Sequence, residues 1–288
     1  KNQSKEIRVE GGRVLNKTII PIPEEMLKLW EPATPWLYQM QVRLSDKKGN
    51  VLDGRKQQFG MRQFVISETS VPKGRFYLNG KEVRLRGTNT MGFLQKSVMA
   101  HDWERLTDDL LLAKLTNINF IRTTQRIVPK EVYEYADRVG MMMQADLPLF
   151  AYINQKQYTE ILKQASGIER VLRNHPSVIL MSYLNESMAE KQAHAISRYA
   201  YERLFDALDV VVHNENPERA VKYVDGDYQA PNNGYPDNHC YNIWYDKHGI
   251  ALPDLGRGAW MKVSKGWMYG CGEFGAEGLD FPDLMKRR

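Results

Sequence analysis

The chain has 288 residues, of which 42% are hydrophobic and 26% charged, an ordinary composition for a globular protein with a sizeable core. The formal net charge of +5 is small and spread along the chain, so we expect no nucleic-acid partner, which would need a clustered basic stripe. No apolar run reaches the roughly 18 residues that a membrane span needs, so we expect no membrane span.

The first 66 residues have the patterns of β-structure. Residues 37–44 alternate apolar and polar side chains, which is typical of a half-buried strand. Turn-forming residues at 46–50 separate this segment from a strand expected over 57–66. We predict that residues 1–66 form a small β-sandwich, whole or in part.

After residue 67, a hairpin is expected over 76–85, with Asn79-Gly80 as its turn. Strands and helices then alternate along the chain. The strands are expected at 84–88, 119–124, 141–149, 177–184, 220–225, 238–242 and 267–274, and the helices at 103–113, 130–139, 161–172 and 193–211. This alternation indicates a parallel sheet with covering helices. We predict a (β/α)8 TIM barrel over residues 67–288, and we expect its final strand and helix to lie outside the chain.

Two of the apolar strands end on a glutamate. Glu186 follows the fourth barrel strand and Glu273 the seventh, and active groups gather at the carboxyl ends of barrel strands. Hydrolysis of a glycosidic bond uses a pair of carboxyl groups that flank the bond. We therefore predict that Glu186 and Glu273 form a two-carboxylate site, with Glu277 as the alternative to Glu273.

Several neighbours of these strand ends are candidate sugar contacts. Asn185 is expected to donate to a sugar hydroxyl, with a helix cap or a turn as the alternative. Arg122 lies inside an apolar strand and needs a buried carboxylate partner, either in the site or in a structural ion pair. His239, Tyr241 and Trp244 belong to an aromatic run that suits stacking on sugar rings, although such runs also occur as core.

We predict no metal site and no organic cofactor. The sequence has no His-Glu-x-x-His or Cys-x-x-Cys pair, no glycine-rich phosphate loop after a strand, and no Gly-x-Ser-x-Gly turn. Asp225 and Asp227, at the tip of another strand, could form a metal site, with a simple turn as the alternative interpretation.

Several motifs together resemble glycoside hydrolase family 2, the family of β-galactosidases, β-glucuronidases and β-mannosidases. In chain order they are WEPATPWLY at 30–38, FGMR at 59–62, LNGK at 78–81, LRGTN at 85–89, NFIRT at 119–123, RNHPS at 173–177 and GEFG at 272–275.

The resemblance implies that the β-sandwich is immunoglobulin-like and that the barrel enzyme retains the anomeric configuration. It implies Glu186 as the acid/base and Glu273 as the nucleophile. Tyr241 resembles a tyrosine that hydrogen-bonds the nucleophile, Arg122 resembles an arginine beneath the same site, and Asn89 belongs to the motif of the first barrel strand. We add Asn89 to the expected substrate contacts.

The sequence also departs from the family. Thr90 follows Asn89 in a segment where the family often has a histidine, and Leu180–Tyr183 lacks the usual tryptophan. These changes affect the choice of sugar. Two rivals stay open: an inactive carbohydrate-binding barrel, and a metal-dependent barrel enzyme that uses Asp225, Asp227 and His239. We expect a carbohydrate substrate, leave a homo-oligomer open, and favour a periplasmic or secreted location over the cytoplasm.

Overall fold

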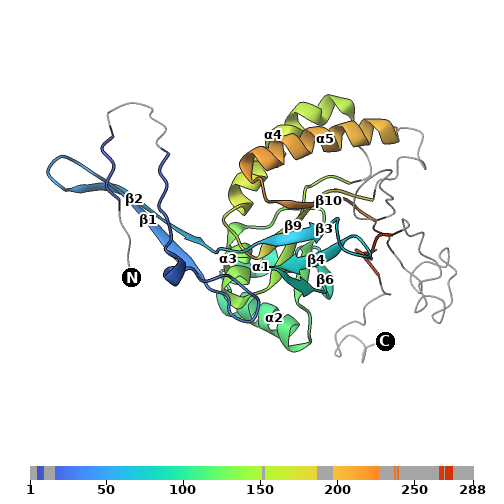
Figure 1. The fold of residues 1–288 in the computed structure, drawn as a ribbon, viewed down its shortest axis with the longest axis horizontal. Coiled ribbons are helices and arrows are strands. Elements are labelled where there is room, and N and C mark those ends of the chain that lie inside the picture. The colour runs from blue at the N-terminus through green and yellow to red at the C-terminus, as the bar shows by residue number, and fades with distance from the viewer. Residues whose placement is uncertain are drawn as a thin grey trace.

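A computed structural model describes residues 5–9, 17–150, 153–186, 197–226, 237, 239, 266–268 and 270–274. Two short antiparallel sheets and one parallel sheet organise this part of the chain, and helices flank the parallel sheet (Figure 1). None of the helices in these ranges is long and apolar enough to span a membrane.

The amino-terminal part is a projecting β-hairpin (Figure 1). After the single-turn helix η1 (Glu24–Met26), strand β1 (Tyr38–Ser45) pairs antiparallel with β2 (Val51–Phe59). Oδ1 of Asp46 accepts the backbone N–H groups of Lys48 and Asn50, which stabilises the turn. The expected strand at 37–44 and its turn are confirmed, and the hairpin is consistent with part of an immunoglobulin-like domain.

The single strand expected over 57–66 is wrong, because β2 ends at Phe59 and β3 (Phe64–Ser67) begins a new sheet. Between them the chain docks on the barrel. A Cβ at Gly60 would lie 2.5 Å from Cγ of Pro176, and the Arg62 guanidinium donates to the carbonyls of Pro176 and Val178 at 3.1 and 2.7 Å. A domain boundary at residue 66 stays a prediction.

The hairpin expected over 76–85 is confirmed as β4 (Arg75–Leu78) and β5 (Lys81–Val83). Asn79 and Gly80 have φ values of 51° and 77°, as a tight two-residue turn requires. The three-stranded sheet β3-β4-β5 packs against residues near the starts of the barrel strands. This second core comprises Trp30, Phe64, Leu78, Phe120, Met142, Ile179 and Leu180.

Five parallel strands form the barrel sheet in the order β10-β9-β8-β7-β6. They are β6 (Gly87–Thr90), β7 (Phe120–Thr123), β8 (Met142–Asp146), β9 (Val178–Asn185) and β10 (Ala220–Asp225). The first strand was expected at 84–88 and instead begins at Gly87. The Asn119 side chain explains the shift, because it bonds the backbone of Arg84 and Arg86.

Helices α2 (Trp103–Leu115), α3 (Lys130–Val139) and α4 (Tyr158–Leu172) lie where the sequence predicts them. Asp102 caps α2 by accepting the N–H of Arg105, and Gly140 ends α3 with a φ of 76°. Helix α1 (Phe93–Met99) was not predicted, and α5 (Arg198–Glu215) extends past the expected end at 211. Helices α4 and α5 lie together on one side of the sheet (Figure 1).

The later barrel strands are described only in part. Asp237, directly before the segment expected as the sixth strand, forms a parallel bridge with Gly270 of the segment expected as the seventh. Residues 238 and 240–242 of the expected strand at 238–242 lie outside the described residues, as does Tyr269 of the segment at 267–274. A closed barrel is therefore an expectation from the family and not a feature of the described sheet.

Candidate active site

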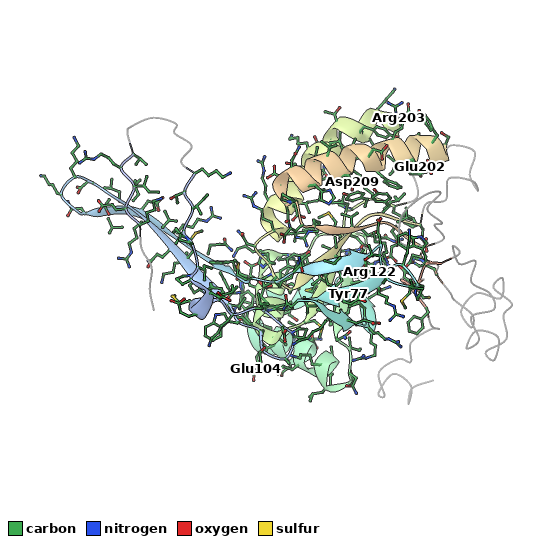
Figure 2. The ribbon with its side chains drawn as sticks, viewed as in Figure 1. Tyr77, Glu104, Arg122, Glu202, Arg203 and Asp209 are labelled. Atoms are coloured by element: carbon green, nitrogen blue, oxygen red, sulfur yellow. The ribbon has the colours of Figure 1, made fainter. Side chains whose placement is uncertain are left out.

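Arg122, which is labelled in Figure 2, contacts three carboxylates of the site. It is 2% exposed and lies on β7. Its Nη2 donates to Asp146 at 2.7 Å, and its Nη1 lies 2.8 Å from Oε1 of Glu273 and 2.6 Å from Oδ1 of Asp225. Burial opposes the positive charge, but the carboxylates of Asp146, Asp225 and Glu273 outweigh burial and raise the pKa of Arg122. The expectation that Arg122 needs a buried carboxylate partner is met by Asp146 and Asp225, and Glu273 is a third, partly buried partner.

The carboxylate of Asp225, the last residue of β10, accepts hydrogen bonds and forms ion pairs with several side chains. Its Oδ1 contacts Arg122 and accepts from His239 at 2.9 Å, and its Oδ2 accepts from Gln144 at 2.7 Å and pairs with Lys222. Burial opposes ionisation of Asp225, but Lys222 and Arg122 reverse that effect and lower its pKa. Asp225 is therefore a fixed anion behind the site rather than a residue of a simple turn.

Lys222 supplies a second buried cation. Its ammonium pairs with Asp225 and lies 3.1 Å from Oδ2 of Asp237. Burial opposes its charge, but the two aspartates outweigh burial and raise the pKa of Lys222. Asp225, Asp237 and His239 bring donor atoms within 4.8 Å of one another, as a metal site would need. In this structure the ammonium of Lys222 already compensates the two aspartates.

Glu186 follows β9, the fourth strand of the parallel sheet, as expected. Its backbone has a φ of 50°, a conformation that costs free energy in a residue other than glycine. A hydrogen bond of 2.8 Å from its N–H to the carbonyl of Asp225 holds this conformation. The glutamate is therefore oriented by the neighbouring strand β10.

His239 bridges the two sides of the site. Nδ1 lies 3.0 Å from Oε1 of Glu186, and Nε2 lies 2.9 Å from Oδ1 of Asp225. Burial opposes the charge, but the hydrogen bonds to Asp225 and Glu186 outweigh it and raise the pKa of His239 from 6.5 to about 9. The imidazole is therefore protonated at neutral pH, and both nitrogens donate.

Glu273 meets Glu186 from the carboxyl-terminal segment. One carboxylate oxygen of each glutamate and a ring nitrogen of His239 all lie within 4.8 Å of one another. Close packing at Gly272 makes this approach feasible, because a Cβ at that position would lie 1.9 Å from Oδ1 of Asp225. The structure thus brings the two predicted glutamates to one place.

Asn185 and Asn89 also border the site. Asn185 is 1% exposed, and its Oδ1 accepts from Nη2 of Arg122 at 2.5 Å. Its Nδ2 is buried without a hydrogen-bond partner among the described residues, so this donor is available to a ligand. Nδ2 of Asn89 donates to the carbonyl of Gly272 at 3.2 Å, next to Glu273.

Four other candidate residues lie outside the described part of the chain. They are Tyr241 and Trp244, the alternative nucleophile Glu277, and Asp227 of the alternative metal site.

Four polar residues of the site were not predicted: Asp146, Gln144, Lys222 and Asp237. A signal for two of them was present. Asp146 ends a buried strand, as Asn185 does, and Lys222 lies inside an apolar strand, as Arg122 does. A buried charge needs a partner in these two cases as well.

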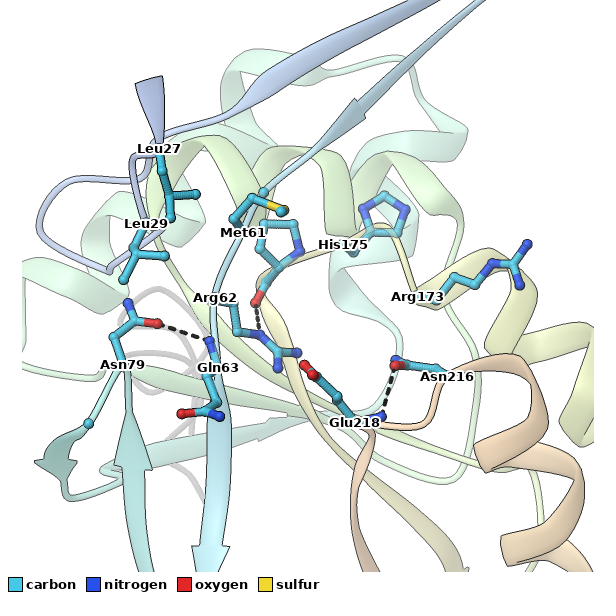
Figure 3. A pocket seen from close by; sticks show the side chains of 13 residues that line it. Leu27, Leu29, Met61, Arg62, Gln63, Asn79, Arg173, His175, Asn216 and Glu218 are labelled. Atoms are coloured by element: carbon cyan, nitrogen blue, oxygen red, sulfur yellow. Dashed lines mark hydrogen bonds between the residues drawn. The ribbon is translucent and has the colours of Figure 1, made fainter. Parts of the chain in front are cut away.

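A separate pocket of about 660 Å³ lies next to the amino-terminal end of β9 (Figure 3). Leu27, Leu29 and Met61 line it from the hairpin side, and Arg173 and Pro176 from the barrel side. Pro176 precedes β9, whereas Glu186 follows it. The pocket is therefore part of the interface between the hairpin and the parallel sheet, and it is separate from the site of the two glutamates.

Two family models match the chain. "Glycosyl hydrolases family 2, TIM barrel domain" covers residues 69–257, and "Glycosyl hydrolases family 2" covers residues 1–62.

Among curated proteins, the chain is 29% identical over 62% of its length to a beta-galactosidase of Oenococcus oeni, and 26% identical over 75% of its length to a beta-galactosidase of Psychromonas ingrahamii. It covers 18% and 20% of these two proteins, so it spans about a fifth of their length. It also resembles the crystal structure of an FMN-binding beta-glucuronidase from Facaelibacterium prausnitzii L2-6. The TM-score is 0.68 and the identity 20%, over 88% of this chain and 39% of that one, so this likeness concerns the fold alone.

Proposed function

Because the chain belongs to glycosyl hydrolases family 2, we propose that the protein hydrolyses terminal β-linked sugars, with retention of configuration at the anomeric carbon. The observation that carries the proposal is the approach of Glu186 and Glu273, whose carboxylate oxygens come within 4.8 Å. Retaining enzymes hold their two carboxyl groups about 5–5.5 Å apart, and inverting enzymes about 6.5–9.5 Å apart, to leave room for a water. The close approach favours retention.

In the first step, Glu273 attacks the anomeric carbon and forms a glycosyl ester as the bond to the leaving oxygen breaks. Glu186 gives its proton to that oxygen, so the leaving group departs as a neutral alcohol. Arg122 holds Oε1 of Glu273 and so orients the carboxylate for attack through Oε2. The guanidinium is fixed by Asp146 and Asp225, so the nucleophile is oriented before the substrate binds.

In the second step, Glu186, now a carboxylate, takes a proton from water while the water oxygen attacks the anomeric carbon. The ester bond breaks, Glu273 returns to a carboxylate, and Glu186 is protonated again. This chemistry needs no organic cofactor.

The unpartnered Nδ2 of Asn185 supports a contact with a sugar hydroxyl close to the reacting carbon. Tyr241 and Trp244 are proposed as further sugar contacts on sequence grounds, and Asn89 as a residue at the edge of the same site. The names of the curated relatives favour a β-galactoside as the substrate.

A screen of aryl β-galactosides, β-glucuronides and β-mannosides on the full-length protein tests the proposal. We expect turnover of at least one, with NMR showing the β-anomer as first product, and we expect Glu273→Ala to abolish turnover. Sugar binding without turnover would favour the inactive carbohydrate-binding alternative, and full activity of Glu273→Ala would remove Glu273 from its role.

A further inference from the structure

His239 connects the two glutamates through a chain of alternating charges. Starting at Glu186, the order is carboxylate, His239 imidazolium, Asp225 carboxylate, Arg122 guanidinium and Glu273 carboxylate, with successive contacts of 3.0, 2.9, 2.6 and 2.8 Å. The imidazole and the guanidinium meet at one atom, Oδ1 of Asp225. The positions of Glu186 and Glu273 are therefore coupled through these buried charged side chains.

We propose that His239 is a positioning residue, which holds Glu186 through Nδ1 and reserves Oε2 of that glutamate for the proton given to the leaving group. This inference rests on the proposed function, since it assigns a role within that reaction. It differs from the sugar contact that the sequence predicts for His239.

The hydrogen bonds of the imidazole support a positioning role. Both ring nitrogens face carboxylates, and the side chain is 3% exposed, so the ring is engaged before a sugar enters. With Nδ1–H directed at Oε1, a proton on Oε1 would face another proton. The acid form of Glu186 therefore carries its proton on Oε2, and the donor atom is defined.

The packing around the ring fixes its place. Gly226 has a φ of 96°, and a Cβ there would lie 2.6 Å from Cε1 of His239. The N–H of Gly226 donates to Oδ1 of Asp237 at 2.9 Å, which holds Gly226, the residue after β10, against the ring. The carboxylates that face the imidazole are Glu186, Asp225, Asp237 at 3.8 Å and Glu273 at 3.9 Å. The ring is thus held between Gly226 and these four carboxylates.

Two substitutions separate the two contacts. In His239→Asn, the amide nitrogen takes the place of Nδ1 and keeps the contact to Glu186. In His239→Gln, it takes the place of Nε2 and keeps only the contact to Asp225. His213→Gln is the matched control, because His213 bonds the carbonyls of Asp209 and Arg219 at the far end of α5.

The measurement is kcat/KM of the full-length protein on aryl glycosides whose phenols differ in acidity. This parameter reports the step in which Glu186 acts as an acid, and only poor leaving groups need that acid. Because general acid catalysis supplies about 10²–10⁴-fold, we expect His239→Gln to lose about 100-fold on unsubstituted phenyl glycosides and less than about 10-fold on dinitrophenyl glycosides. We expect His239→Asn to lose clearly less than His239→Gln on phenyl glycosides, and His213→Gln to stay within about fivefold of the parent on both.

Loss by the same factor on good and poor leaving groups, in both His239 variants, would overturn the positioning role and favour direct sugar contact. In a Glu186→Ala background, His239→Gln should cause no further loss on phenyl glycosides, and an additive loss would also overturn the inference. This second measurement applies even if one His239 variant is poorly folded. A parent protein that cleaves no glycoside would instead refute the proposed function, and the inference with it.

Discussion

Arg122 and Glu273 are 151 positions apart in the chain, yet Nη1 of the arginine lies 2.8 Å from Oε1 of the glutamate. The guanidinium cannot lose its charge at any relevant pH, and its planar shape fixes the direction of each N–H. Asp146 and Asn185 occupy other donors of the same group, so it cannot turn away from Glu273. An ion pair of this kind orients the carboxylate of Glu273, the proposed nucleophile, in addition to stabilising the fold.

Removal of the Glu186 carboxyl group should lower kcat/KM by a factor that depends on the leaving group. We expect Glu186→Ala to lose most of its kcat/KM on phenyl glycosides, by about 10²–10⁴-fold, because it lacks the general acid. On dinitrophenyl glycosides the glycosyl-enzyme should form and accumulate, and azide should restore turnover by attacking it. Mass spectrometry of the trapped enzyme and NMR of the glycosyl azide check both steps. A product with inverted configuration would contradict the assignment.

Asn185 should act mainly on the transition state. Hydrogen bonds to the sugar 2-hydroxyl strengthen as the reaction proceeds, and loss of one such donor costs about 10²-fold in rate. We expect Asn185→Ala to lower kcat/KM by this factor on the normal substrate and by much less on its 2-deoxy analogue. Equal losses on the two substrates would show that Nδ2 does not meet that hydroxyl.

The sequence predicts the strands of this site better than its electrostatics. The expected strand at 220–225 matches β10 residue for residue, because an apolar run between turn residues defines a buried strand. Which polar groups meet across the sheet depends on strand order and register, and these are properties of the whole fold. Pairing of Gln144 with Asp225, 81 positions apart, could not be derived from either local pattern.

The dependence of polar contacts on the whole fold also explains why the role predicted for Asp225 is incomplete. Asp225 was interpreted as a turn residue or a metal ligand, because its sequence neighbours Gly226 and Asp227 suggest a turn. In the structure Asp225 pairs with Lys222, Arg122 and His239, and Gly226 packs directly against the ring of His239. Only the three-dimensional arrangement reveals that the strand tip faces inward.

Gly272 should tolerate no side chain. A Cβ would lie 1.9 Å from Oδ1 and 2.7 Å from Cγ of Asp225, so Gly272→Ala must displace Glu273 or Asp225. Misplacement of a reacting group by about 1 Å costs about 10²-fold in rate, and we expect at least this loss in kcat/KM. Gly167→Ala is the control, because a Cβ there meets nothing within 4 Å and should leave kcat unchanged. Unchanged kinetics in Gly272→Ala would contradict the close packing.

Lys222 should stabilise the fold by neutralising two buried aspartates. Lys222→Met leaves Asp225 and Asp237 without this cation, and breaking a buried ion pair costs about 3–5 kcal/mol. We expect a loss of this size in the free energy of unfolding in urea, partly restored by adding Asp237→Asn. Lys163→Met removes a lysine that is 79% exposed and should change stability by less than about 0.5 kcal/mol. An additive double variant would show that Lys222 and Asp237 do not interact.

Stability should fall as the pH rises through the range in which His239 loses its proton. The pKa of His239 is about 9 in the folded protein, against a reference value of 6.5, because hydrogen bonds to Asp225 and Glu186 favour the charged ring despite its burial. The folded state therefore holds this proton more tightly, so its contribution is complete below pH 6.5 and is lost as the pH passes 9. A difference of this size corresponds to about 3 kcal/mol. Urea unfolding at about pH 6 and about pH 9.5 should show this loss in the parent and a much smaller one in His239→Gln, whereas equal losses in the two proteins would assign the pH dependence to other groups.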